Sequence, residues 1–142
     1  EITDVLNKQS GMLGISGLSG DMRTIEKAAE KGHEGAKLAL EVSSYRLAKY
    51  IAAMCIATGR LDALVFTGIN GENASIIRAK TIAYLGILGL KLDEAANEAT
   101  RFGKAGVITQ ADTLPCALVV PTNEERMIAI DTLRLAGMAG VS

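Results

Sequence analysis

The sequence predicts an α/β protein in which helices flank a mostly parallel sheet. Two stretches, 63–84 and 116–135, share one order of parts: a short apolar run, a polar turn, and a segment with helical spacing. Such a unit is typical of a buried strand followed by a helix, the connection that parallel strands need. The composition agrees, because 49% of the residues are apolar but only 4% are aromatic, which favours helices packed on a sheet.

The length of 142 residues predicts a single domain, 1–142, with a core of its own. The net charge is −1, and acidic and basic residues alternate along the chain, which argues against a nucleic-acid partner or an anionic membrane surface. The nearly uncharged run 50–58 is too short to span a bilayer. Cys55 and Cys116 lie in apolar runs without metal or redox spacing, so we expect buried free thiols and a reducing, cytoplasmic location.

Glycine and serine punctuate residues 1–20, which predicts a loop rather than regular structure. Asp21 can cap a short helix that runs to about Glu30. Arg23, in the first turn of that helix, is either a solvated charge or a planar cation that stacks on a base or pairs with a carboxylate.

A long helix is predicted from Glu34 to about Thr58, ended by Gly59 and supported by a Lys37–Glu41 pair. His33 precedes it as a solvated loop residue. The second half of this helix is apolar nearly all round, so it must be covered on more than one side, at the centre of the domain or of a dimer.

The stretch 63–74, ALVFTGINGENA, predicts a buried strand, a tight turn with Gly68 and Gly71, and a helix that opens at Glu72 or Asn73 and ends near Tyr84. A loop at the carboxyl end of such a strand is a usual place for a ligand, and a helix start favours an anion. The alternative is a plain connection whose glycines only let the chain turn. Arg78 and Lys80, in this helix, are expected to face water.

The rest of the chain predicts a turn and short edge strand in 85–92, a brief helix from Asp93 to Thr100, and a weak strand near Val107. Arg101 and Lys104 are read as surface charges. Residues 116–120 are predicted to form a buried strand that ends before Pro121, and 123–135 a helix with Glu124 and Glu125 in its first turn. The NGEN and TNEE segments would then converge on one edge of the sheet, where a carboxylate can hold Mg²⁺ through water.

Five segments in order resemble the acetate kinase (acetokinase) family: SGMLGISGLSGDMR, SSYRLAKYIAA, RLDALVFTGINGENA, RFGKAGVI and VVPTNEERMIAIDTLRLA. The resemblance covers essentially the whole chain and implies the C-terminal portion of a longer protein. It also implies an actin-like, ribonuclease H-like ATPase fold, related to sugar kinases. The reaction implied is reversible transfer of the γ-phosphoryl group of ATP to acetate, which gives acetyl phosphate and ADP with Mg²⁺.

Carried over by position, the resemblance implies two nucleotide-binding segments and one metal-associated glutamate, Glu124. The first segment matches the part of the family that touches adenosine, and the second is the GINGEN turn. The cofactor-binding residues are Asp21, Met22, Arg23, Gly68, Ile69, Asn70, Gly71, Glu72 and Asn73.

The family residues that flank the transferring phosphate lie upstream of this chain, so no catalytic residue is expected within it and the chain alone is expected to be inactive. The resemblance also implies a homodimer, with nucleotide and a short-chain carboxylate bound by the full-length enzyme. Propionate kinase is an alternative, because the acyl pocket would lie upstream. A second alternative is a non-catalytic module in which the helix from Tyr45 to Thr58 mediates dimerisation.

The chain departs from the family at two positions: family members read GGIGEN where this chain reads GINGEN, so Ile69 replaces glycine and Asn70 replaces isoleucine. If the glycine serves a left-handed backbone, Ile69 would cost about 1–2 kcal/mol or reshape the turn. If the glycine serves close approach of adenosine, Ile69 would obstruct the site.

Overall fold

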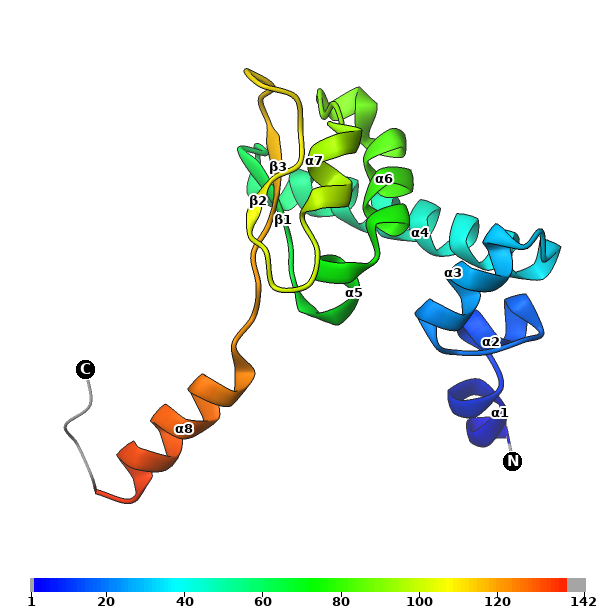
Figure 1. Ribbon diagram of the computed structural model, residues 1–142, viewed down its shortest axis with the longest axis horizontal. Coiled ribbons are helices and arrows are strands. Elements are labelled where there is room, and N and C mark those ends of the chain that lie inside the picture. Colours follow the sequence, from blue (N-terminus) through cyan, green and yellow to red (C-terminus); the bar gives the residue numbers. More distant parts are fainter. Residues whose placement is uncertain (1, 138–142) are drawn as a thin grey trace.

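The computed structural model describes residues 2–137 (Figure 1). It is an α/β structure, as expected, built from eight α-helices, one 3₁₀ helix and three strands among the described residues. In chain order the elements are α1 (Ile2–Lys8), α2 (Gly11–Ser16), α3 (Met22–Glu30), α4 (Glu34–Thr58), β1 (Ala63–Phe66), α5 (Gly68–Asn73), α6 (Ser75–Tyr84), η1 (Leu85–Leu88), α7 (Glu94–Ala99), β2 (Gly106–Val107), β3 (Cys116–Val119) and α8 (Glu124–Leu135).

The sheet is small and mixed, with strand order β1-β3-β2. β1 and β3 are parallel, with Ala63 opposite Cys116 and Phe66 opposite Val119, so the two predicted strand units do lie side by side. β2 pairs antiparallel to β3. Val65 and Val107 both pair with Leu118 on the same face, and they remain 50% and 54% exposed. The sheet is therefore mixed rather than mostly parallel, and among the described residues this face of it stays open.

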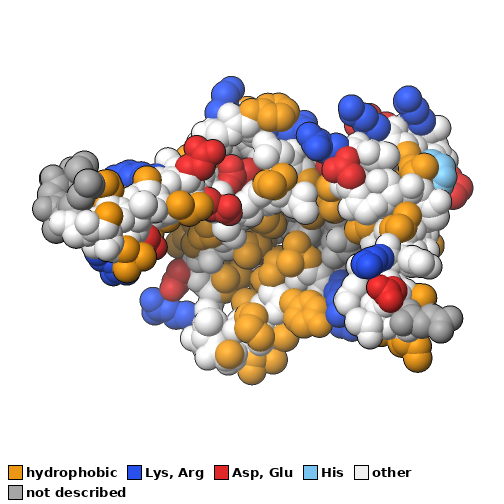
Figure 2. Space-filling view, turned by 90° about the horizontal axis from the view of Figure 1, so that it is seen from below, with side chains coloured by type: hydrophobic (Ala, Val, Ile, Leu, Met, Phe, Trp, Pro, Cys, Tyr) orange, Lys and Arg blue, Asp and Glu red, His pale blue; other side chains and the backbone are white. Residues whose placement is uncertain are grey.

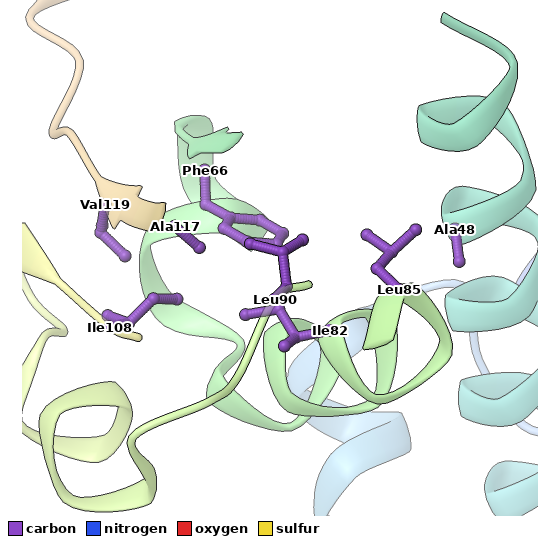
Figure 3. Close-up of a cluster of buried hydrophobic side chains, with 8 residues drawn as sticks. All are labelled: Ala48, Phe66, Ile82, Leu85, Leu90, Ile108, Ala117 and Val119. Carbon is purple, nitrogen blue, oxygen red and sulfur yellow. The ribbon is translucent and has the colours of Figure 1, made fainter. Parts of the chain in front are cut away.

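The other face of the sheet carries the main core (Figure 3). Phe66, Ala117 and Val119 point from β1 and β3 toward side chains of α6, η1 and α4. This cluster of buried residues comprises Ala48, Phe66, Ile82, Leu85, Leu90, Ile108, Ala117 and Val119.

A second core lies where α3, α4 and α6 meet, with Ile25, Ala36, Leu40 and Ile77 among its buried members. The long helix α4 contributes to both cores, and it connects α1–α3 with the sheet (Figure 1). Gly35 makes the packing of α2 on α4 possible, because a Cβ there would lie only 2.4 Å from the Ser16 carbonyl oxygen.

Several predicted helix ends are confirmed by their capping hydrogen bonds. Asp21 accepts from the Thr24 amide at 3.1 Å, and Asp93 accepts from the Ala96 amide at 2.9 Å. α4 has the predicted bounds and ends at Gly59, which is left-handed. His33, expected as a plain loop residue, instead caps α4: its Nδ1 accepts from the Ala36 amide at 3.1 Å.

Other expectations are wrong. The loop expected for residues 1–20 is replaced, within the described residues 2–20, by α1 and α2. Lys37 pairs with Glu34 and not with Glu41, whose carboxylate binds Lys80 of α6 at 2.6 Å and the hydroxyl of Tyr84. Cys55 and Cys116 are free thiols, but both are only half-buried.

α8 extends away from the rest of the molecule (Figure 1), and none of its residues is buried. The apolar half of α4 is also not covered as expected, since Tyr50, Met54 and Ile56 are 56%, 59% and 85% exposed. None of the helices within residues 2–137 is long and apolar enough to cross a membrane.

Candidate functional site

The turn after β1 is itself a short helix, α5, and this corrects the prediction that Glu72 or Asn73 opens a longer helix. Asn73 is the last residue of α5, and α6 begins at Ser75. Gly68 starts α5 with a left-handed φ of 71°. A Cβ at Gly71 would lie 3.2 Å from the Phe66 carbonyl carbon, so glycine allows α5 to pack against the end of β1.

Ile69 does not occupy a left-handed position. The left-handed residue of the turn is Gly68, whereas Ile69 lies inside α5 with its side chain 82% exposed. Backbone strain is therefore the wrong explanation for the departure at this position. The second explanation, obstruction of a ligand, stays a prediction.

Glu72 joins the two predicted loops. Its Oε1 atom accepts hydrogen bonds from the backbone N–H of Thr122 at 2.9 Å and from the Thr122 hydroxyl at 3.0 Å. These donors, the Thr122 amide foremost, lower the pKa of Glu72, because they stabilise its ionised form. The expected meeting of the NGEN and TNEE segments is confirmed at this contact.

Arg78 is the largest correction, because it is completely buried rather than solvated. Its guanidinium donates to the carbonyl oxygens of Gly71 and Glu72 at 2.8 and 2.7 Å. It also donates to Asn97 and Thr100 at the end of α7. Burial lowers its pKa. The sequence holds a signal for this position, since Arg78 stands four and seven residues before the buried Ile82 and Leu85.

A cleft of about 570 Å³ lies between α3, α5 and the turn after α7. Figure 2, the view from below, shows the middle of the molecule hollowed, with apolar side chains on its walls. The cleft brings together residues from both predicted nucleotide segments. It is lined by Met22, Arg23, Glu26, Lys27, Glu30, Ile69, Asn70, Asn73, Ala74, Arg101 and Phe102.

The wall that Arg101 and Phe102 form was not predicted. The Phe102 amide donates to Asn73 Oδ1 at 3.0 Å, which fixes this wall to the end of α5, and the Phe102 ring is 80% exposed. Arg101 stands 5.1 Å from the centre of that ring and pairs with Glu98 at 3.3 Å. The reading of Arg101 as a plain surface charge is therefore wrong.

Glu26 is a second unpredicted group in the cleft. Burial is the main cause that raises its pKa, against a smaller lowering by the charge of Arg101. Its Oε1 atom and the Nε atom of Arg101 are both buried without a hydrogen-bond partner.

The predicted residues play different parts. Met22, Arg23, Ile69, Asn70 and Asn73 line the cleft. Asp21 caps α3 instead, and its hydrogen bonds with Thr24 lower its pKa. The Arg23 side chain, 85% exposed, stands 3.6 Å from the Asp21 carboxylate at the Nε atom. Gly68, Gly71 and Glu72 shape α5 and do not line the cleft.

Glu124 lies outside the cleft, exposed in the first turn of α8, where Asn123 caps the helix. Within residues 2–137, no three His, Cys, Asp or Glu residues come together as a group that could hold a metal ion.

Known proteins resemble this chain closely. Residues 1–130 match the acetokinase family. Acetate kinase 1 of Neisseria meningitidis serogroup A is 64% identical over 138 residues, which are 97% of this chain and 35% of the relative. The acetate kinase of Deinococcus radiodurans is 54% identical over 140 residues, which are 99% of this chain and 35% of the relative.

Two crystal structures give the same result. Porphyromonas gingivalis acetate kinase matches with a TM-score of 0.85 and 43% identity, over 95% of this chain and 34% of that one. A propionate kinase from Francisella tularensis matches with a TM-score of 0.81 and 45% identity, over 90% of this chain and 32% of that one. The chain thus spans about a third of the length of the relatives that it matches. It belongs to the acetokinase family.

Proposed function

We propose that the cleft between α3 and α5 binds ATP or ADP, and that the chain is the C-terminal nucleotide-binding portion of an acetate kinase with an actin-like ATPase fold. The observation that carries the proposal is the lining of the cleft, to which both segments predicted to bind nucleotide contribute. A volume of about 570 Å³ lies within the usual range for a small-molecule site.

Arg23 is the residue best suited to hold the base. A guanidinium is planar and stacks on aromatic rings, and that of Arg23 is 85% exposed at the edge of the cleft. Met22 and Ile69 give apolar contact, and the exposed Phe102 ring offers a second stacking surface. Asn70 supplies an amide group, whereas the Asn73 amide binds the backbone of Phe102 and Ile69 and so shapes the cleft. Asp21, Gly68, Gly71 and Glu72 act by shaping α3 and α5.

Mg²⁺ would be held at Glu124 together with the nucleotide phosphates. This ion is usually bound by one or two carboxylates, waters and phosphate oxygens rather than by an all-protein cage. A single exposed carboxylate fits that arrangement. When bound, the ion would neutralise charge on the phosphates.

The full-length protein would transfer the γ-phosphoryl group of ATP to acetate or another short-chain carboxylate. Such transfer depends mainly on positioning and on cations around the phosphoryl group. The similarity to both acetate and propionate kinases leaves the carboxylate open, since the acyl pocket would lie outside these 142 residues. We expect the chain alone, as one domain, to bind nucleotide without forming acetyl phosphate. Its free thiols fit a cytoplasmic protein.

Dimerisation through α4 is a second function, with or without nucleotide binding. Leu38, Val42, Tyr45 and Ile56 recur at helical spacing on one face of α4, and all four side chains are exposed. Tyrosine and arginine are enriched in the energetically important parts of interfaces. This face has both, with Arg46 positioned 5.5 Å from the ring centre of Tyr50.

Calorimetric titration of the chain with Mg·ATP tests nucleotide binding. Arg23→Ala should weaken the affinity about threefold to thirtyfold, the effect of losing one cation–π contact. Arg60→Ala is the matched control, because Arg60 is similarly exposed at 79% but lies outside the cleft. A folded parent that releases no heat of binding, or an Arg23 variant with unchanged affinity, would contradict the proposal.

A further inference from the structure

Arg78 contacts the carbonyl groups that end two short helices. Gly71 and Glu72 belong to the last turn of α5, and Asn97 and Thr100 lie at the end of α7. The carbonyl oxygens at a helix end have no partners within the helix and carry partial negative charge. The Arg78 guanidinium stands between both sets, so a single cation from α6 caps the carboxyl ends of α5 and α7.

All five N–H groups of the guanidinium are used. Nη1 donates to the two α5 carbonyl oxygens at 2.8 and 2.7 Å, and Nη2 donates to the carbonyl oxygens of Asn97 and Thr100 at 2.6 and 2.9 Å. Nε donates to Asn97 Oδ1 at 2.8 Å. Only arginine has five donors in a fixed plane. The amide of Asn97 in turn donates to the Ser75 carbonyl oxygen at 3.0 Å, which closes the network.

The Arg78 side chain forms no ion pair with a carboxylate in the part of the chain that the structure describes. A buried cation is costly to desolvate, and an apolar residue would fill the same core space at lower cost. The gain from arginine is therefore geometric: it fixes four backbone carbonyl groups relative to one another.

We propose that Arg78 is a positioning residue for the cleft: it holds α5, which forms the floor, in register with the turn after α7, which forms the Arg101–Phe102 wall. The hydrogen bond from the Phe102 amide to Asn73 Oδ1 is a second link between the same two parts. Arg78 itself does not line the cleft, so it acts only through these elements. This role rests on the proposed function only for the identity of the ligand in the cleft. The link between α5 and the turn after α7 does not depend on that function.

Arg78→Lys and Arg78→Met test this role, with Arg60→Lys as the control at an exposed arginine. Amide hydrogen exchange of α5 and Phe102 would be compared with that of Ala39 and Leu40, which are buried in α4. We expect exchange in α5 and at Phe102 to quicken about tenfold or more in both variants, with lysine the milder. The exchange of Ala39 and Leu40 should change much less. Affinity for Mg·ATP should fall in the same order, whereas Arg60→Lys should match the parent.

Unchanged exchange in α5 would overturn the proposal. Equal quickening in α4 and α5, or failure of both variants to fold, would also overturn it, because Arg78 would then support the whole fold rather than the cleft. If the parent binds nucleotide, and the Arg78 variants exchange faster in α5 but bind Mg·ATP as tightly as the parent, the proposed effect of Arg78 on ligand binding would be refuted. A parent that binds no nucleotide would refute the proposed function, and the exchange comparison would still decide whether Arg78 positions α5.

Discussion

Ser44 of α4 and Thr81 of α6 are completely buried, and their hydroxyl groups have no hydrogen-bond partner among the described residues. A buried polar atom without a partner loses its hydration and gains nothing in return. The two residues lie on α4 and α6, which pack together. The interface between these helices therefore contains two hydroxyl groups whose desolvation is not compensated by a hydrogen bond.

Replacing Ser44 with alanine should therefore stabilise the protein. We expect the free energy of unfolding to rise by about 1 kcal/mol, from removal of the unpaired hydroxyl and the better helix propensity of alanine. Ser43→Ala is the control, because it makes the same change at the neighbouring, half-buried position of α4. Urea unfolding measures both. An equal gain in the two variants would show that propensity alone is responsible.

Ile69→Gly distinguishes a strained turn from an ordinary helix. Because Ile69 lies within α5 and not at the left-handed position, glycine should lower the free energy of unfolding by about 0.5 kcal/mol through its poorer helix propensity. Relief of left-handed strain would instead raise it by about 1–2 kcal/mol. Asn70→Gly, at the next exposed position of α5, should show a similar small loss. Chemical denaturation of the three proteins decides between the signs.

Residues whose role is local were predictable, and those whose role depends on distant partners were not. Asp21 and Asp93 cap helices through amides three residues away, so spacing alone identified them. The sequence predicts a solvated Arg78, because its partners Asn97 and Thr100 are 19 and 22 residues away and leave no local signal. A charge on an apolar helix face was the available signal.

At the scale of elements, the same contrast holds for α2 and α4. The periodicity of α4 was strong enough to give its bounds, whereas the glycines and serines of residues 10–20 concealed α2. α2 is stabilised by packing on α4, where Gly35 lets the Ser16 carbonyl approach. Composition within a short window cannot show such a contact.

The link between α5 and the turn before α8 should depend on pH through Glu72. Its pKa is lowered in the folded protein, so its contribution to stability is complete above the unfolded pKa of about 4.3 and is lost as the pH falls through the folded pKa. The Thr122 amide, which donates to Glu72, should report this titration in its ¹⁵N and ¹H chemical shifts.

Glu72→Gln should abolish that titration, since a neutral amide replaces the carboxylate. Glu34→Gln should leave it intact, because Glu34 binds Lys37 on α4. A midpoint at or above about 4.3 for the Thr122 amide would show that the hydrogen bonds do not favour the ionised form of Glu72.

At the scale of the whole molecule, the pairing of the two strand units was predictable, but the extent of the sheet was not. Both units carry their own strand and turn signals, so β1 and β3 followed from pattern. The exposed pair Val65 and Val107 could not be foreseen, because whether a sheet face is covered depends on which helices the chain supplies. Here α4 and α6 cover the face that carries Phe66 and Val119.

Exposure of the α4 face has a consequence for assembly. Ile56, 85% exposed at the end of this face, contributes almost nothing to the core of one chain, so changing it should spare the fold. In a symmetric dimer formed through α4, glutamate at this position would place one unpaired charge from each subunit in an apolar interface. We expect Ile56→Glu to weaken dimerisation about tenfold or more in sedimentation equilibrium. Ile87→Glu, which makes the same change at a 91% exposed position of η1 rather than of α4, should leave the association constant unchanged. A parent that is monomeric at high concentration, or equal weakening by both variants, would mean that α4 is not the contact surface.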